Sequence, residues 1–115
     1  QMQRDFTYVD DVIEALVRLV DLPPSKDSGV SSAGVPHTIY NIGNHTPIEL
    51  KHFIGVLEAA LGREAHKRYL PMQPGDVLTT CADVERLSRV TGFAPRTTIE
   101  DGIARFTEWF RSYHG

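Results

Sequence analysis

The densest motif of the chain covers residues 3–12, which read Gln3-Arg4-Asp5-Phe6-Thr7-Tyr8-Val9-Asp10-Asp11-Val12. In this stretch an Arg, three acids and two aromatic residues stand directly before a run of apolar residues with helical spacing that continues to Val20. Asp10 and Asp11 suit the start of that helix, because an Asp caps exposed N–H groups and favours the positive end of the helix dipole. Pro23 and Pro24 then predict its end.

Two short polar stretches are candidates for binding a ligand. Arg4 could grip a diphosphate, because its planar guanidinium matches two phosphate oxygens. The alternative is an exposed Arg–Asp ion pair, which contributes little. Pro74-Gly75-Asp76 predicts a tight turn that could hold the Asp76 carboxylate toward a ribose hydroxyl. The alternative there is a turn with no ligand.

The first half of the remaining chain predicts a loop, a strand and a helix. Residues 23–37 are rich in Pro, Ser and Gly, which predicts a mobile loop. Residues 38–42 are β-branched and aromatic, which predicts a short strand. Thr46-Pro47-Ile48-Glu49 reads as a capping box for a helix that runs to Leu61, with Gly62 as its left-handed C-terminal residue.

The second half predicts two more helices and weaker strands. Residues 68–70 and 79–81 are candidate strands. Asp83 is expected to cap a short helix that closes at Gly92. Either Thr97 or Thr98 caps the last helix. The apolar face of that helix comprises Ile99, Ile103, Phe106, either Trp109 or Phe110, and Tyr113.

Length and composition predict one soluble α/β domain over residues 1–115, with about four helices and two or three short strands. The strands are too few for a doubly wound sheet, so we expect a small lobe that leans on another structure. With 12 basic and 15 acidic side chains, nucleic-acid binding is not expected. The chain has no apolar run of the ~20 residues that span a bilayer. The single cysteine, Cys81, favours a reducing cytoplasm.

Several catalytic signatures are missing from the sequence. It contains no Gly-rich dinucleotide motif, no Tyr followed four residues later by Lys, no Cys/His pair with metal spacing and no Gly-x-Ser-x-Gly. The five histidines are scattered and read as solvated surface residues. The chain opens at Gln1 inside the dense motif, from which we expect that an upstream part exists.

Taken together, the motifs resemble the NAD-dependent epimerase/dehydratase family, the extended short-chain dehydrogenases/reductases. The resemblance runs from Gln1 nearly to the end and is weakest over residues 23–37. It is carried by residues 3–12, Tyr40-Asn41-Ile42-Gly43-Asn44, Met72-Gln73-Pro74-Gly75-Asp76-Val77, Ala82-Asp83 and Gly92-Phe93-x-Pro95. Within the family, the stretch from Met72 to Val77 looks most like UDP-glucuronate 4-epimerases.

The resemblance implies that residues 1–115 are the C-terminal, nucleotide-sugar-binding part of such an enzyme. Its N-terminal Rossmann domain, which holds NAD and the catalytic Tyr and Lys, would be absent, so we expect no catalytic residue and no bound cofactor in this chain. In such enzymes hydride moves to NAD, the 4-keto sugar rotates, and hydride returns to the other face. By matching motifs, Arg4 would contact the diphosphate and Asp76 the uridine ribose. Gln73 stands where UDP-galactose 4-epimerases carry a phosphate-binding Arg, and it would be a weaker polar contact.

From these implications we expect the chain alone to be inactive. We also expect it to bind UDP with millimolar affinity or not at all, because association costs at least ~4 kcal/mol before any contact is counted. The surface that would meet the Rossmann domain is expected to be apolar and to invite self-association. Three related enzymes remain as alternatives: UDP-galactose 4-epimerase, a nucleotide-sugar 4,6-dehydratase and UDP-glucuronate decarboxylase. Two other classes also remain: a non-catalytic binding module and a ligand-free helical domain.

Overall fold

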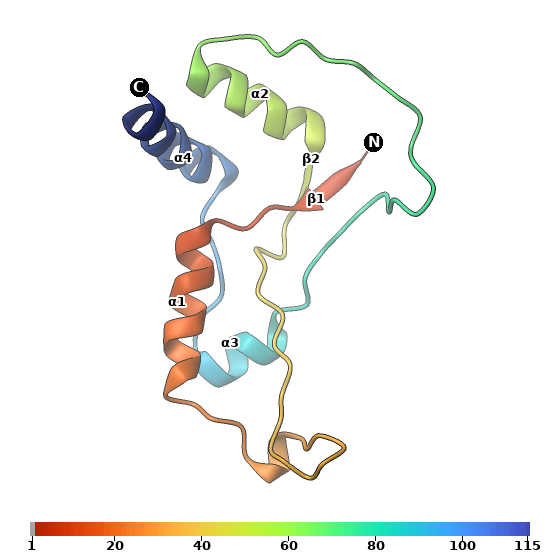
Figure 1. Cartoon of the computed structure of the whole chain (residues 1–115), viewed down its shortest axis with the longest axis vertical. Coiled ribbons are helices and arrows are strands. Elements are labelled where there is room, and N and C mark those ends of the chain that lie inside the picture. Colours follow the sequence, from red (N-terminus) through yellow and green to blue (C-terminus); the bar gives the residue numbers. More distant parts are fainter. Residues whose placement is uncertain (1) are drawn as a thin grey trace.

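The computed structural model describes residues 2–115 and contains four α-helices and two short strands in that range (Figure 1). Their order confirms a small α/β lobe without a large sheet. The elements are β1 (Gln3–Asp5), α1 (Val9–Val20), the 3-10 helix η1 (Lys26–Ser28), β2 (Pro47–Glu49), α2 (Leu50–Leu61), α3 (Glu85–Thr91) and α4 (Ile99–His114).

Strand β1 lies at the centre of the lobe. It pairs antiparallel with β2, with Arg4 opposite Ile48. On its other edge, the Gln3 N–H donates to the Leu78 carbonyl at 2.8 Å, and the Thr80 N–H donates to the Gln3 carbonyl at 3.3 Å. The predicted extended piece at residues 79–81 is therefore present only as one isolated bridge, between Gln3 and Thr79. The motif that opens the chain thus joins two segments that are distant in sequence.

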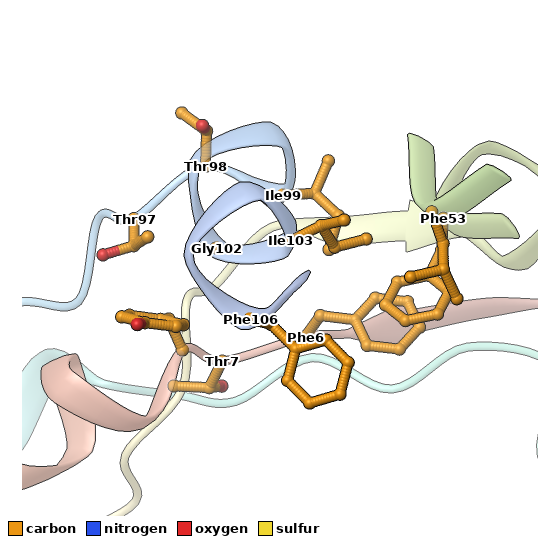
Figure 2. A pocket seen from close by; sticks show the side chains of 11 residues that line it. Phe6, Thr7, Phe53, Thr97, Thr98, Ile99, Gly102, Ile103 and Phe106 are labelled. Carbon is orange, nitrogen blue, oxygen red and sulfur yellow. The ribbon is translucent and has the colours of Figure 1, made fainter. Parts of the chain in front are cut away.

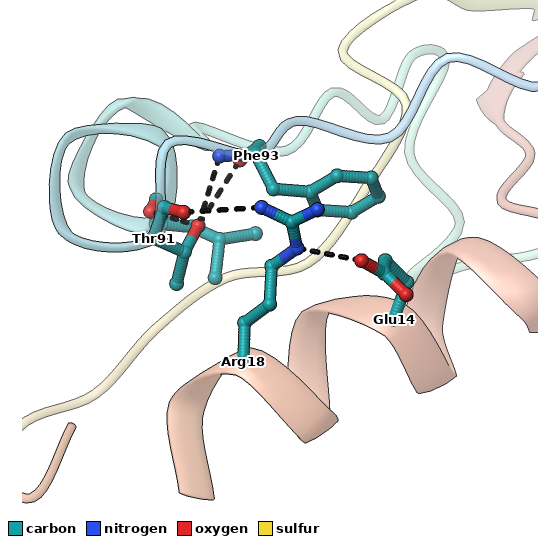
Figure 3. Close-up of polar contacts among 5 residues, drawn as sticks. Glu14, Arg18, Thr91 and Phe93 are labelled. Atoms are coloured by element: carbon teal, nitrogen blue, oxygen red, sulfur yellow. Dashed lines mark hydrogen bonds and ion pairs between the residues drawn. The ribbon is translucent and has the colours of Figure 1, made fainter. Parts of the chain in front are cut away.

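The helices form two pairs on opposite sides of β1 (Figure 1). Helix α2 packs on α4, and α1 packs on α3. At the second junction, the Arg18 guanidinium donates to Glu14 at 2.6 Å and to the Thr91 carbonyl at 3.4 Å, and it lies 5.1 Å from the centre of the Phe93 ring (Figure 3). The fully buried core is small; its hydrophobic members are Ala15, Leu87 and Ile103.

Two strand predictions are wrong, and a strand forms where a helix start was predicted. Residues 38–42 and 68–70 contain no strand. The predicted capping box at residues 46–49 instead contains β2, so α2 begins at Leu50. Its N-cap, Glu49, makes no side-chain capping bond. Pairing with β1 outweighs the local capping pattern, and Pro47 is tolerated because it is the first residue of the strand.

Helix ends agree better with the sequence. Gly62 adopts the left-handed conformation predicted for it, with φ of 68°. Gly92, where α3 was predicted to end, is also left-handed, with φ of 66°. Thr98, rather than Thr97, caps α4 by accepting the Asp101 N–H at 3.2 Å. The Asp83 carboxylate accepts the Glu85 N–H at 3.0 Å at the start of α3, although the N-cap position itself is Val84.

Helix α1 begins at Val9, ahead of the two acids, Asp10 and Asp11, that were predicted to stand at its start. Its N-cap is Tyr8, which makes no side-chain capping bond, so the predicted capping by Asp10 or Asp11 is wrong. Both acids lie in the first turn instead, where a negative charge still favours the helix dipole. The acids therefore support the helix start without capping it.

The predicted loop at residues 23–37 contains local structure. It holds η1 and then a tight reversal, in which Val30 bridges Pro36 and the Ser31 N–H donates to the Val35 carbonyl at 2.8 Å. Among residues 2–115, no helix combines the length and the apolar character that crossing a bilayer requires.

Candidate functional site

Arg4 lies on β1 and is anchored to the segment that follows the Pro-Gly-Asp turn. Its Nη1 donates to the carbonyl oxygens of Gln3 at 2.9 Å, Val77 at 2.8 Å and Leu78 at 3.4 Å. Its Nε and Nη2 make no hydrogen bond or ion pair with any described residue. One nitrogen therefore fixes the side chain, and the other two have N–H donors that no described residue accepts.

The second predicted element is a turn. The Asp76 N–H donates to the Gln73 carbonyl at 3.1 Å, which closes a four-residue turn. Gly75 occupies φ of 92°, a conformation that side-chain-bearing residues rarely adopt. The side chains of Gln73 and Asp76 are exposed and, within the described chain, unbonded. Because Val77 follows Asp76 directly and accepts from Arg4, the structure places the turn beside the guanidinium.

The alternative of an ion pair involving Arg4 is not seen in the described part of the chain. The neighbouring acid, Asp5, is used differently: its carboxylate accepts backbone N–H bonds from Asn44 at 3.0 Å, His45 at 3.1 Å and Ala82 at 2.8 Å. Its own N–H donates to the Thr80 hydroxyl at 3.1 Å. Asp5 thus fastens two distant segments, residues 44–45 and 80–82, to the end of β1.

Asp11 has a similar role at the start of α1. Its carboxylate accepts the N–H groups of Arg96 at 3.2 Å and Thr97 at 2.9 Å. The roles of both acids were not predicted, because nothing in the local sequence indicates which distant N–H groups an acid will meet. The only available signal was the density of acids around Arg4.

Two apolar cavities lie near Arg4, Asp5 and Asp11. One, of about 230 Å³, lies between α4, α2 and residues 6–8; the rings of Phe6 and Phe53 stack there with centroids 4.2 Å apart (Figure 2). No charged side chain lines it. The other, of about 340 Å³, is formed by the start of α2 and the segment before the turn, with Lys51 5.6 Å from the centre of the Tyr69 ring. Met72 and Leu78 also line it, which places it next to the candidate site.

The described residues do not fit a dinucleotide cofactor. The two strands are antiparallel, and β2 passes directly into α2 at Leu50 with no glycine at the junction. A dinucleotide pyrophosphate needs a Gly-rich turn between a strand and a helix. Residues 2–115 also contain no group of three or more His, Cys, Asp or Glu side chains arranged to hold a metal.

No protein-family model matches the chain. An uncharacterized 37.6 kDa protein from the cld 5′ region of Escherichia coli O111:H- is 48% identical, over 99% of this chain and 36% of its own length. A probable UDP-glucuronate 4-epimerase of Rhizobium meliloti is 42% identical, over 96% of this chain and 35% of its own length.

Among solved structures, MoeE5 in complex with UDP-glucuronic acid and NAD superposes with a TM-score of 0.74 at 29% identity, over 95% of this chain and 33% of that chain. The chain therefore spans about a third of the length of the relatives that it matches. These matches confirm the resemblance drawn from residues 3–12 and 72–77: the chain is a homologue of UDP-glucuronate 4-epimerases and a relative of the NAD-dependent epimerase/dehydratase family, over about a third of their length.

Proposed function

We propose that this chain is the UDP-sugar-binding, C-terminal lobe of a nucleotide-sugar 4-epimerase whose whole protein interconverts UDP-glucuronate and UDP-galacturonate through a 4-keto intermediate. The observation that carries the proposal is the anchoring of Arg4. One nitrogen bonds the backbone beside the Gln73–Asp76 turn, and no described residue bonds the other two nitrogens. The names of the Rhizobium meliloti relative and the MoeE5 complex support the choice of sugar.

Arg4 would bind the diphosphate through Nε and Nη2. These atoms lie on one edge of the guanidinium, and such an edge matches two oxygens of a phosphate group. Because Nη1 is already held by the carbonyls of Val77 and Leu78, less side-chain freedom is lost when a ligand binds. The same bonds couple the guanidinium to the segment that carries Asp76.

Asp76 would accept hydrogen bonds from the ribose hydroxyls. Its carboxylate is exposed, and the closed turn at Gly75 fixes its backbone. Gln73, at the start of that turn, would add a neutral polar contact. It cannot supply the charged fork of an Arg, and this substitution favours the glucuronate enzyme over the galactose enzyme.

Hydride transfer would require NAD, which the whole protein would hold outside this chain. No step of that chemistry is assigned to residues 2–115, because they do not fit a dinucleotide. The isolated chain is therefore expected to lack epimerase activity and to bind UDP with a dissociation constant of about 1 mM or weaker. The task of this chain would be to hold and orient the UDP group.

The binding test follows amide NMR shifts while UDP and then UDP-glucuronate are added to the labelled chain. Shifts are expected around Arg4 and residues 73–76. These shifts should disappear in Arg4→Ala and become smaller in Asp76→Asn. The Asp76 side chain makes no hydrogen bond or ion pair with any described residue, so this substitution should leave the fold intact. Arg63→Ala removes the same charge from an exposed position and should bind like the wild type.

A chimera provides the second arm, because affinity in isolation is expected to be low. This chain would replace the matched third of the Rhizobium meliloti relative, and conversion of UDP-glucuronate to UDP-galacturonate would be assayed. Turnover that falls at least tenfold in Arg4→Ala but not in Arg63→Ala supports the proposal. A folded chimera that neither binds nor converts UDP-glucuronate contradicts it.

A further inference from the structure

The Gln73–Asp76 turn lies in a segment that the rest of the lobe holds only loosely. Residues 68–76 are all exposed, and they form a wide loop between α2 and α3 (Figure 1). They make no hydrogen bond or ion pair with any described residue outside the segment; the Lys51 ammonium lies 5.6 Å from the centre of the Tyr69 ring, ahead of the turn. The bond from the Asp76 N–H to the Gln73 carbonyl sets the shape of the turn, not its position.

The first hydrogen bond that follows the turn comes from the Arg4 side chain. Its Nη1 donates to the carbonyl of Val77, the residue directly after Asp76, at 2.8 Å. The backbone of β1 reaches only one residue further along, where the Gln3 N–H donates to the Leu78 carbonyl at 2.8 Å. The guanidinium is therefore the group that holds the residue next to Asp76.

We propose that Arg4 is the positioning residue for Asp76, so that recognition of the nucleoside, and not only of the diphosphate, depends on the guanidinium. The inference rests on the proposed function, in which Nε and Nη2 bind the diphosphate. Nη1 then acts on the fold while the other two nitrogens act on the ligand. Because a group that is already ordered loses less freedom on binding, holding Val77 favours the contact between Asp76 and the ribose.

Uridine separates the two roles of Arg4, because it has the ribose and no phosphate. If Arg4 served the diphosphate alone, Arg4→Ala would leave the affinity for uridine unchanged. If Arg4 positions Asp76, the substitution frees Val77, and the turn must then be ordered when uridine binds. We expect the uridine affinity to fall about three- to tenfold, the cost of ordering one further side chain on binding.

Arg4→Lys is the matched variant. A Lys ammonium on its long stem can donate to the Val77 and Leu78 carbonyls, but it is a point charge without a second edge for a phosphate group. We therefore expect Arg4→Lys to bind uridine within about twofold of the wild type, while its affinity for UDP falls about fivefold or more. Arg63→Ala removes a positive charge from an exposed position and should change neither affinity.

The measurement is a titration of the chimera with uridine and with UDP, followed through the NMR signals of the ligand. Circular dichroism checks that each variant is folded, and Arg4→Met, which keeps an apolar stem without donors, replaces Arg4→Ala if that variant does not fold. Equal uridine affinities in the wild type and in the variant without donors would overturn the inference. An affinity for uridine as low in Arg4→Lys as in that variant would overturn it too.

The affinity for UDP gives a second readout, because uridine makes fewer contacts and is expected to bind weakly. Asp76→Asn is introduced into the wild-type chimera and into Arg4→Ala. If the two side chains act independently, their fold-losses of affinity multiply. If Arg4 positions Asp76, Asp76→Asn should cost about threefold less affinity in Arg4→Ala than in the wild type, and losses that simply multiply would contradict the positioning role.

The proposed function and this inference fail in different ways. A folded wild-type chimera that does not bind UDP contradicts the proposed function. A chimera whose UDP affinity depends on Arg4, but whose uridine affinity does not, leaves the proposed function standing and contradicts the positioning role of Arg4.

Discussion

The carboxylate of Asp5 accepts a hydrogen bond from the backbone N–H of Ala82 at 2.8 Å, although 77 positions separate the two residues. The same carboxylate accepts from Asn44 and His45, so it joins the end of β1 to two distant segments. Arg4 precedes Asp5 on that strand, and its guanidinium contacts the chain that leads to Ala82. Asp5 therefore fixes the position of β1 relative to the segment that Arg4 contacts.

Removing the Asp5 carboxylate should destabilise the fold. Asp5→Ala leaves three backbone N–H groups without their acceptor, and we expect a loss of roughly 2–4 kcal/mol in the free energy of unfolding. Urea unfolding followed by circular dichroism measures it. Asp21→Ala removes an exposed acid at the end of α1 and should cost little by comparison. A loss no larger than that of Asp21→Ala would show that water replaces Asp5 as acceptor.

A methyl group at Gly43 should be poorly tolerated. A Cβ there would lie 2.9 Å from Asp5 Oδ2 and in steric conflict with the Ala82 side chain. Gly43→Ala is expected to cost more than about 1 kcal/mol, because it forces apart the segments that Asp5 joins. Gly55→Ala is the matched control: its Cβ would meet open space on α2, so it should stabilise by about 0.5–1 kcal/mol. Thermal unfolding of both variants tests whether Gly43→Ala destabilises the protein while Gly55→Ala stabilises it.

The cap of α4 should be specific to one of two adjacent threonines. The Thr98 hydroxyl accepts the Asp101 N–H at 3.2 Å, whereas Thr97 is held through its backbone groups. Thr98→Ala should lower the free energy of unfolding by about 1 kcal/mol. Thr97→Ala keeps those backbone bonds and should have less than half that effect. If Thr97→Ala destabilised the protein more than Thr98→Ala, the capping residue of α4 would be Thr97.

Lowering the pH should weaken the bonds between α2 and the segment that follows it, and so lower the free energy of unfolding. Hydrogen bonds from the Lys67 ammonium and the Ala65 N–H lower the pKa of Glu58 below its ordinary value. A lowered folded-state pKa gives stability that is present above the unfolded-state pKa and is lost as the pH falls through the folded-state value. The free energy of unfolding should therefore fall as the pH drops below the ordinary Glu pKa of about 4.3, and this slope should be shallower in Glu58→Gln.

Urea unfolding across this pH range measures the slope. Glu108→Gln is the control, because the Glu108 side chain makes no hydrogen bond or ion pair with any described residue, and its slope should match the wild type. Equal slopes in Glu58→Gln and the wild type would show that the bonds to Lys67 and Ala65 contribute nothing to the pH dependence.

Features that depend only on neighbouring residues could be predicted from the amino-acid sequence. Helix ends at Gly62 and Gly92 follow from the need for a left-handed residue, and that need is local. The family resemblance could also be recognised from the sequence, because it rests on residue types in a fixed order. Arg4, Gln73 and Asp76 were candidates on the same basis, and their binding roles stay a prediction.

Contacts between distant segments became known only from the three-dimensional fold. A strand needs a neighbouring chain for its hydrogen bonds, so residues 38–42 form none despite their pattern, while Pro47–Glu49 becomes a strand by pairing with β1. The bond from Arg4 to the Val77 carbonyl spans 73 positions, and nothing near either residue predicts it. Local preferences are free-energy differences of about 1 kcal/mol, and the burial and pairing of distant segments outweigh them.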